Sequence, residues 1–184
     1  FTLIQTLEPM NETQREHARA LSLADSMADA LNALGEPYPL VRDCVKAGQH
    51  PQELVDSMRD KLAWTVPSEF FDAYQEAALW SSIYQDDEGD DLPMDDGEHE
   101  LAQETLDQFL ADCALFIAEC ESSKLDPFPQ SQDQSGHDFW LTRNGHGAGF
   151  WDRGIGKLGD DLSEVCKMQG SCELYLGDDG MIYC

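Results

Sequence analysis

The stretch TLDQFLADCALFIAEC at residues 105–120 carries the clearest helical pattern in the chain and predicts a long helix over residues 98–121. Its apolar residues recur every three or four positions, which aligns them along one stripe of a helix. The stripe consists of Leu106, Phe109, Leu110, Cys113, Phe116, Ile117 and Cys120. Asp107, Asp112 and Glu119 fall off this stripe, so we expect them on the solvent side of the helix.

Helical spacing also covers most of the chain before this stretch. Asn11 is a good N-cap for a helix that ends before Gly35. Further helices are predicted around residues 40–47, after Pro51, and over SEFFDAYQEAALWSS at residues 68–82. The body of the protein is therefore expected to contain about five helices.

The end of the chain changes to strand patterning. The runs HDFWLT, CELYLG and MIYC predict strands, with a short helix at residues 158–170 after the first of them. The residues Asp178, Asp179 and Gly180 between the last two runs are typical of a tight hairpin. The predicted fold class is α+β, with a small C-terminal antiparallel sheet built from residues 138–142, 172–176 and 181–184.

The length of 184 residues fits one compact unit with a real core. Within it we distinguish an N-terminal helical segment, residues 1–67, from residues 68–184, which hold an acidic helical region and the C-terminal hairpin.

Negative charge is concentrated in the middle of the chain. The formal net charge is -26, and residues 65–135 hold 19 acidic residues with Lys124 as their one base. A surface that serves only solubility spreads its acids along the chain, so this concentration favours a surface directed at a partner. Such a field repels nucleic acid and anionic membranes and attracts basic partners over a Debye length of about 8 Å.

The segment DDEGDDLPMDDGEHE at residues 86–100 contains nine acids and no lysine or arginine. Gly89, Pro93 and Gly97 interrupt any continuous helix there. The spacing of the acids does not match a calcium-binding loop. We predict a solvated loop, with weak binding of a divalent ion as the alternative.

Six cysteines are present, and none of them forms a zinc-type pair. Cys113 and Cys120 lie on one helical stripe, as reduced core cysteines do, and a disulfide between late cysteines is the alternative. The longest apolar runs fall far short of the ~20 residues that span a bilayer. No basic segment followed by an apolar one marks the given sequence for secretion, and a leader that has been removed is the alternative. We expect a cytoplasmic protein without metal or cofactor.

The segment GHDFWLTRNGHGAGFWDRGIG at residues 136–156 is the second distinctive feature, and we call it the aromatic-glycine box. Six glycines permit tight turns, while aromatic rings can stack on guanidinium groups. Its candidate contact residues are Trp140, Arg143, Asn144, His146, Trp151 and Arg153. We rank a structural role first, recognition of a partner or small ligand second, and catalysis third, because no cysteine or histidine stands in a nucleophile motif.

Several of these motifs occur together in a known group of proteins. The runs ALWSS at residues 78–82, Asp112-Cys113 followed by Phe116, DFWLTRNGHGAGFWDRG at residues 138–154 and the GDDG turn resemble small uncharacterised proteins of bacteriophages and other mobile elements. The resemblance covers residues 68–184. It implies a phage-type origin and a reduced cytoplasmic setting inside a host cell, and it implies no reaction.

Together these observations predict an accessory protein that inhibits a host nucleic-acid-binding protein through a DNA-like acidic surface. Eighteen net negative charges correspond to ~30 Å of duplex. The expected contact residues are Asp86, Asp87, Glu88, Asp90, Asp91, Asp107, Asp112 and Glu119. The alternative is a small enzyme or ligand-binding protein with its site at Arg143, Asn144 and His146.

Overall fold

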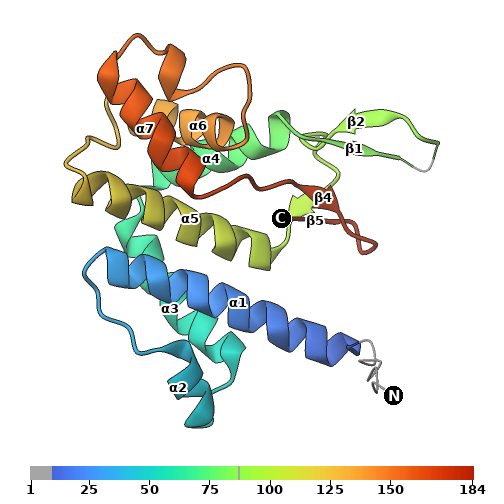
Figure 1. The fold of residues 1–184 in the computed structure, drawn as a ribbon. Helices are drawn as coiled ribbons and strands as arrows, with labels where there is room; N and C mark the ends of the chain where they lie inside the picture. The colour runs from blue at the N-terminus through green and yellow to red at the C-terminus, as the bar shows by residue number, and fades with distance from the viewer. Residues whose placement is uncertain (1–9, 87) are drawn as a thin grey trace, which may run out of the picture.

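The computed structural model describes residues 10–86 and 88–184, and helices dominate these residues (Figure 1). The helices are α1 (Glu12–Ala33), α2 (Val41–Lys46), α3 (Pro51–Thr65), α4 (Ser68–Trp80), α5 (Gln103–Ser122), α6 (Gln132–Arg143), the 3-10 helix η1 (Phe150–Asp152) and α7 (Lys157–Met168). The strands are β1 (Ile83–Gln85), β2 (Asp91–Pro93), β3 (Glu100–Leu101), β4 (Tyr175–Leu176) and β5 (Met181–Tyr183). The α+β class is confirmed at this level.

Helix α5 lies at the centre of the fold. Figure 1 shows α1 and α3 against one side of it and α4, α6 and α7 against the other. Twelve residues of α5 are buried, on more than one face, as expected of a helix covered from both sides. The helical pattern of residues 105–120 therefore marks the element around which the others assemble.

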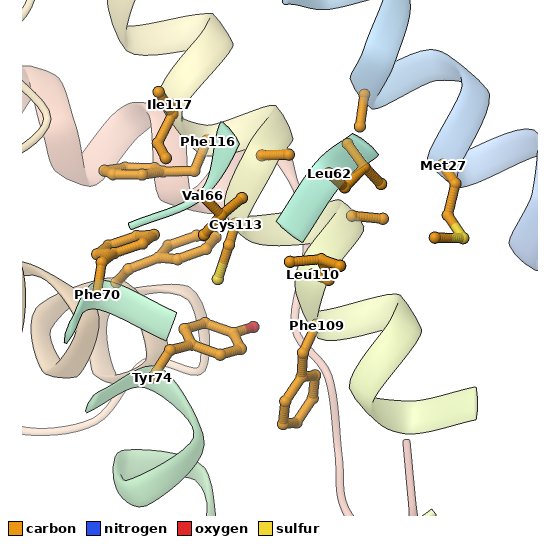
Figure 2. Close-up of a cluster of buried hydrophobic side chains, with 14 of the residues drawn as sticks. Met27, Leu62, Val66, Phe70, Tyr74, Phe109, Leu110, Cys113, Phe116 and Ile117 are labelled. Atoms are coloured by element: carbon orange, nitrogen blue, oxygen red, sulfur yellow. The ribbon is translucent and has the colours of Figure 1, made fainter. Parts of the chain in front are cut away.

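Aromatic side chains fill the space between α4, α5 and α6 (Figure 2). The rings of Phe116 and Phe139 stack with their centroids 4.4 Å apart, and Tyr74 meets Phe109 edge to face at 5.0 Å. Such offset and edge-to-face pairs are the favourable aromatic geometries. The same buried cluster continues from Leu23 in α1 to Cys172, so the described residues before and after position 67 share one core.

The starts of α1 and α3 are fixed by side chains. Asn11 Oδ1 accepts a hydrogen bond from the backbone N–H of Gln14, and the backbone N–H of Asn11 donates one to Gln14 Oε1. His50 and Glu53 form the equivalent box at α3, with Pro51 as its first residue. These caps satisfy amide groups that a helix start leaves without partners.

The predicted strand at residues 138–142 is wrong, because these residues lie within α6. Helix α6 packs tightly on α4: a Cβ at Gly136 would collide with the carbonyl oxygen of Phe70. Phe139, Trp140 and Leu141 are consecutive, and all three are buried. The segment therefore lacks the polar face by which a helical period is recognised in a sequence. When α6 and α7 are counted, the described residues contain seven α-helices, whereas about five were expected for the body of the protein.

The C-terminal sheet has a different composition from the predicted one. Strand β5 lies between β4, its antiparallel partner, and β3, which runs parallel to it. Because residues 100–101 are a strand, the long helix begins at Gln103 rather than at residue 98. Strands β1 and β2 form a separate antiparallel hairpin that projects from the body (Figure 1).

A disulfide joins Cys172 to Cys184, while Cys44, Cys113, Cys120 and Cys166 are free thiols. The late-cysteine alternative therefore holds for this pair. Among the residues that the structure describes, no helix is long and apolar enough to cross a membrane.

Candidate functional site

Arg143 of the aromatic-glycine box points into the protein interior. Its side chain is 4% exposed and donates hydrogen bonds to Asp112 Oδ2 at 2.6 Å and to the hydroxyl of Tyr74 at 2.7 Å. The Nε atom also donates to the carbonyl of Gly170 at 2.8 Å. This guanidinium is thus occupied by the core network and is turned away from any solvent-borne substrate.

Burial and the neighbouring groups have opposite effects on the pKa of Arg143. Burial disfavours the charged guanidinium, but Tyr74 and Asp112 outweigh that effect and raise the pKa of Arg143. Burial likewise raises the pKa of Tyr74 well above its usual range, so the hydroxyl remains a neutral phenol. The result is one cation and one anion, paired in the core.

Two further arginines hold buried aspartates. Arg153 forms a bidentate pair with Asp138, with its Nη2 atom 2.6 Å from Oδ1. Arg59 of α3 forms a second bidentate pair, with Asp107 of α5, in which its Nη2 atom lies 2.6 Å from Oδ2. Bidentate pairs of this kind are the strongest class of charged hydrogen bond.

The expected exposure of Asp107 and Asp112 is therefore wrong. Both residues are buried, since each neutralises an arginine that reaches α5 from another helix. Glu119 is half-buried. A possible signal in the sequence was the flanking of Asp112 by Ala111 and Cys113, small buried residues that let a neighbouring helix approach closely.

Trp140 and Asn144 tie the C-terminal segment to α4 and α6. The indole N–H of Trp140 donates to Ser81 Oγ at 2.9 Å. Asn144 accepts the backbone N–H of Cys172 at 2.9 Å and donates to the carbonyl of Trp140. Both side chains therefore make contacts that hold the fold together.

A shallow groove of about 320 Å³ opens beside these two residues. Its lining comes from Ser81, Ser82, Ile83, Trp140, Asn144, His146 and the segment from Ser171 to Leu174. Arg143 does not line it, so the structure separates the arginine from Asn144 and His146. Trp151 and Arg153 lie elsewhere, Trp151 being half exposed on η1.

The chemistry of this groove does not favour catalysis. Ser81 Oγ already accepts from Trp140 and donates to the carbonyl of Ala77 at 2.6 Å. A serine nucleophile needs its hydroxyl proton free for transfer to a base such as histidine. The groove is therefore better suited to contact than to reaction.

The acidic hairpin, which we define as residues 83–93, presents its charges at a tight turn. Gln85 pairs with Asp91 across the strands. Asp86 Oδ1 accepts the backbone N–H groups of Glu88 at 3.0 Å and Asp90 at 2.8 Å. Glu88, Asp90 and Asp91 are exposed, and Asp87 lies outside the described residues.

The turn after the hairpin anchors it to the C-terminal sheet. The hydroxyl of Tyr84 donates to Asp96 at 2.9 Å, and its ring meets His99 edge to face at 5.2 Å. His99 Nδ1 lies 3.0 Å from the carbonyl oxygen of Gly180. Backbone N–H bonding from Glu98 and the Tyr84 hydroxyl lower the pKa of Asp96, which keeps this anchor ionised.

Two groups of side chains in this region offer metal-ligating atoms within 4.8 Å of one another. They are Asp86, Glu88 and Asp90, and Asp96, Glu98 and His99. In the first group Asp86 Oδ1 is occupied by two backbone N–H groups, which compete with a cation for the same oxygen. These groups show how acidic the region is and do not by themselves define a metal site.

A larger groove of about 690 Å³ was not predicted from the sequence. It lies between α1, the starts of α3 and α5, and strands β4 and β5. His17 and His50 meet edge to face there at 5.7 Å, and Arg19 pairs with Glu104 at 3.7 Å. Its residues come from distant parts of the chain, so no local pattern could have identified it.

Comparisons with models of protein families, with curated proteins and with solved structures found no match for this chain.

Proposed function

We propose that this protein binds and inhibits a basic, nucleic-acid-binding protein of a host cell by presenting an acidic surface in place of nucleic acid. The sequence resemblance of residues 68–184 to phage and mobile-element proteins supports an accessory role in a host cell. One observation carries the proposal: seven acids of residues 88–100 are exposed on a projecting hairpin and its following turn, and among the described residues no lysine or arginine pairs with them.

Exposed acids without an ion-pair partner occur elsewhere too, such as Asp25, Asp29 and Asp72, but residues 86–100 hold nine acids in fifteen positions. Among the described residues of 86–100, the only acid beside a basic side chain is Asp96, 3.9 Å from the ring of His99, whereas Asp107, Asp112 and Asp138 are each neutralised by an arginine. Uncompensated like charges repel one another and destabilise a compact fold. A basic partner would relieve that repulsion, so the same charges that cost stability contribute to association.

The acids are gathered at two turns rather than spaced along an extended strand. Among the described ones only Asp91 in β2 and Glu100 in β3 lie in strands. They can therefore meet a cluster of cations that normally binds phosphates. The proposed contact surface excludes the buried Asp107 and Asp112. It comprises Asp86, Asp87, Glu88, Asp90, Asp91, Asp95, Glu98 and Glu100, with the half-buried Glu119 as a further candidate.

The test begins with a basic nucleic-acid-binding protein isolated from bacterial lysate on the immobilised protein. Its affinity is then measured between about 50 mM and about 500 mM NaCl, and we expect a steep loss because salt screens the attraction. DNA should compete with the protein for the same site. Binding that is insensitive to salt, together with simultaneous binding of DNA, would contradict the proposal.

A matched pair of variants tests whether binding depends on where the negative charge lies or only on the total charge of the protein. The triple variant Glu88→Lys, Asp90→Lys, Asp91→Lys should weaken binding at least about tenfold. The control Asp25→Lys, Asp29→Lys, Glu36→Lys changes the net charge equally at exposed positions in and just after α1 and should weaken binding less. Equal losses in both variants would show that net charge alone drives binding.

A further inference from the structure

The two regions singled out in the sequence, the acidic hairpin and the aromatic-glycine box, meet at the base of the hairpin. Ile83 is the first residue of β1 and also lines the groove of about 320 Å³, together with Asn144 and His146. The residues that join α4 to the hairpin thus share this groove with the box. A ligand that covers the hairpin can reach this groove without a break.

Apolar side chains are exposed at this junction. Ile83 is 61% exposed and Trp80, three residues earlier, is 51% exposed, and neither belongs to the core. Ile83 stands directly across from Pro93 in the hairpin, so these two side chains share one face. Tyr84 and Leu92 occupy the opposite face, where Tyr84 bonds to the turn that holds Asp96.

Charge decides what can cover this apolar face. Beyond Ile83 and Pro93, the same face continues to Gln85 and Asp91 and then to the acidic turn. Glu173 stands on the far side of the groove, and no lysine or arginine lines it. Nucleic acid and anionic lipid are repelled here, whereas a cationic segment is attracted.

The backbone favours an extended ligand. Within residues 10–86 and 88–184, β1 and β2 pair only with each other, so the hairpin keeps free strand edges. A free edge offers unpaired N–H and C=O groups to a strand from another chain, and side-chain pockets beside it then give specificity. The groove next to Ile83 is such a pocket.

We infer that the partner docks here through an extended basic segment that carries one large apolar side chain, which enters the groove between Ile83 and His146 while neighbouring lysines or arginines face the acidic turn. This inference rests on the proposed function and refines it, since it names the partner segment. Acids provide attraction from a distance, and the groove selects among basic sequences.

Two synthetic peptides of about nine residues, long enough to span the hairpin, test this directly. Both alternate lysine with serine, and they differ at the central position, which is leucine in one and serine in the other. Fluorescence anisotropy at low salt should show that the wild-type protein binds the leucine peptide about tenfold more tightly, the gain expected for burial of one large apolar side chain. The substitution Ile83→Ser should remove this preference and leave the salt dependence of both peptides unchanged.

Two further variants test whether the preference for the leucine peptide depends on the groove. Trp64→Ser removes an apolar side chain that is 91% exposed on α3 and should leave the tenfold preference intact. Ser171→Trp fills the groove from its exposed rim and should abolish the preference as Ile83→Ser does, with thermal melting monitoring the fold of every variant.

Equal binding of the two peptides by the wild-type protein, or equal effects of Ile83→Ser and Trp64→Ser, would overturn the apolar anchor while leaving salt-dependent binding in place. A different result would contradict the proposed function. The triple lysine variant of the hairpin would then bind both peptides as tightly as the wild-type protein does.

Discussion

At the scale of single residues, the distinction between paired and unpaired carboxylates organises this protein. Asp107, Asp112 and Asp138 are buried and each is held by an arginine. The exposed acids of residues 86–100 have no such partners among the described residues, apart from Asp96 with His99. Identical side chains therefore perform opposite tasks: inside, they fix the positions of helices, and outside, they give the molecule its field.

The buried pairs predict a large asymmetry between single and double substitutions. Asp112→Ala should cost about 3–5 kcal/mol of unfolding free energy, because it strands the buried charge of Arg143. The double variant Asp112→Ala, Arg143→Met removes both charges and should be more stable than the single one. Urea unfolding measures both, with Asp72→Ala on the exposed surface of α4 as a control that stays within about 0.5 kcal/mol. A loss for Asp112→Ala no larger than for Asp72→Ala would refute the argument.

At the scale of elements, local pattern predicted the helices with a polar face and failed where burial came from distant residues. Helices α1 and α3 were found because their apolar stripes and caps lie in the local sequence, and α5 was found from its stripe. Helix α6 was missed because α4, α5 and the C-terminal segment cover it on several sides. Strand β3 exists through pairing with Met181 and Ile182, far away in sequence.

The candidate site, too, could be predicted from the sequence only in part. The exposure of the acidic hairpin followed from its composition, since glycine, proline and repeated acids cannot form a core. That Ile83 and His146 line one groove depends on how α4 packs against α6, and no spacing within either segment encodes it.

The hairpin is expected to contribute charge and little stability. In the variant Glu88→Gln, Asp90→Asn, Asp91→Asn, the melting temperature at low salt should be unchanged or higher, because like charges no longer repel. The bonds that Asp86 makes to the turn remain in this variant. Scanning calorimetry with calcium or with a chelator completes the test. A melting temperature of the wild type that rises with calcium, together with destabilisation in the variant, would instead establish an ion at Asp86, Glu88 and Asp90.

At the scale of the whole molecule, a shared core opposes a large net charge. The buried cluster extends from Leu23 to Cys172 and binds both parts of the chain together. Against this, the formal net charge of -26 produces self-repulsion that is strongest in the compact state. Stability should therefore depend on ionic strength more than the few exposed ion pairs would suggest.

Raising NaCl from about 20 mM to about 300 mM shortens the Debye length from roughly 20 Å to roughly 6 Å. Repulsion between acids on the hairpin, α1 and α7 is then screened, while the buried pairs of Arg143 and Arg153 are little affected. We expect the melting temperature to rise by several degrees, since about 1 kcal/mol corresponds to roughly 2–4 °C in a chain of this size. The neutralised hairpin variant should show a smaller rise, because part of the screened repulsion is already gone. A melting temperature that falls with salt would mean that exposed ion pairs outweigh the net repulsion, and the view of an uncompensated acidic surface would have to be abandoned.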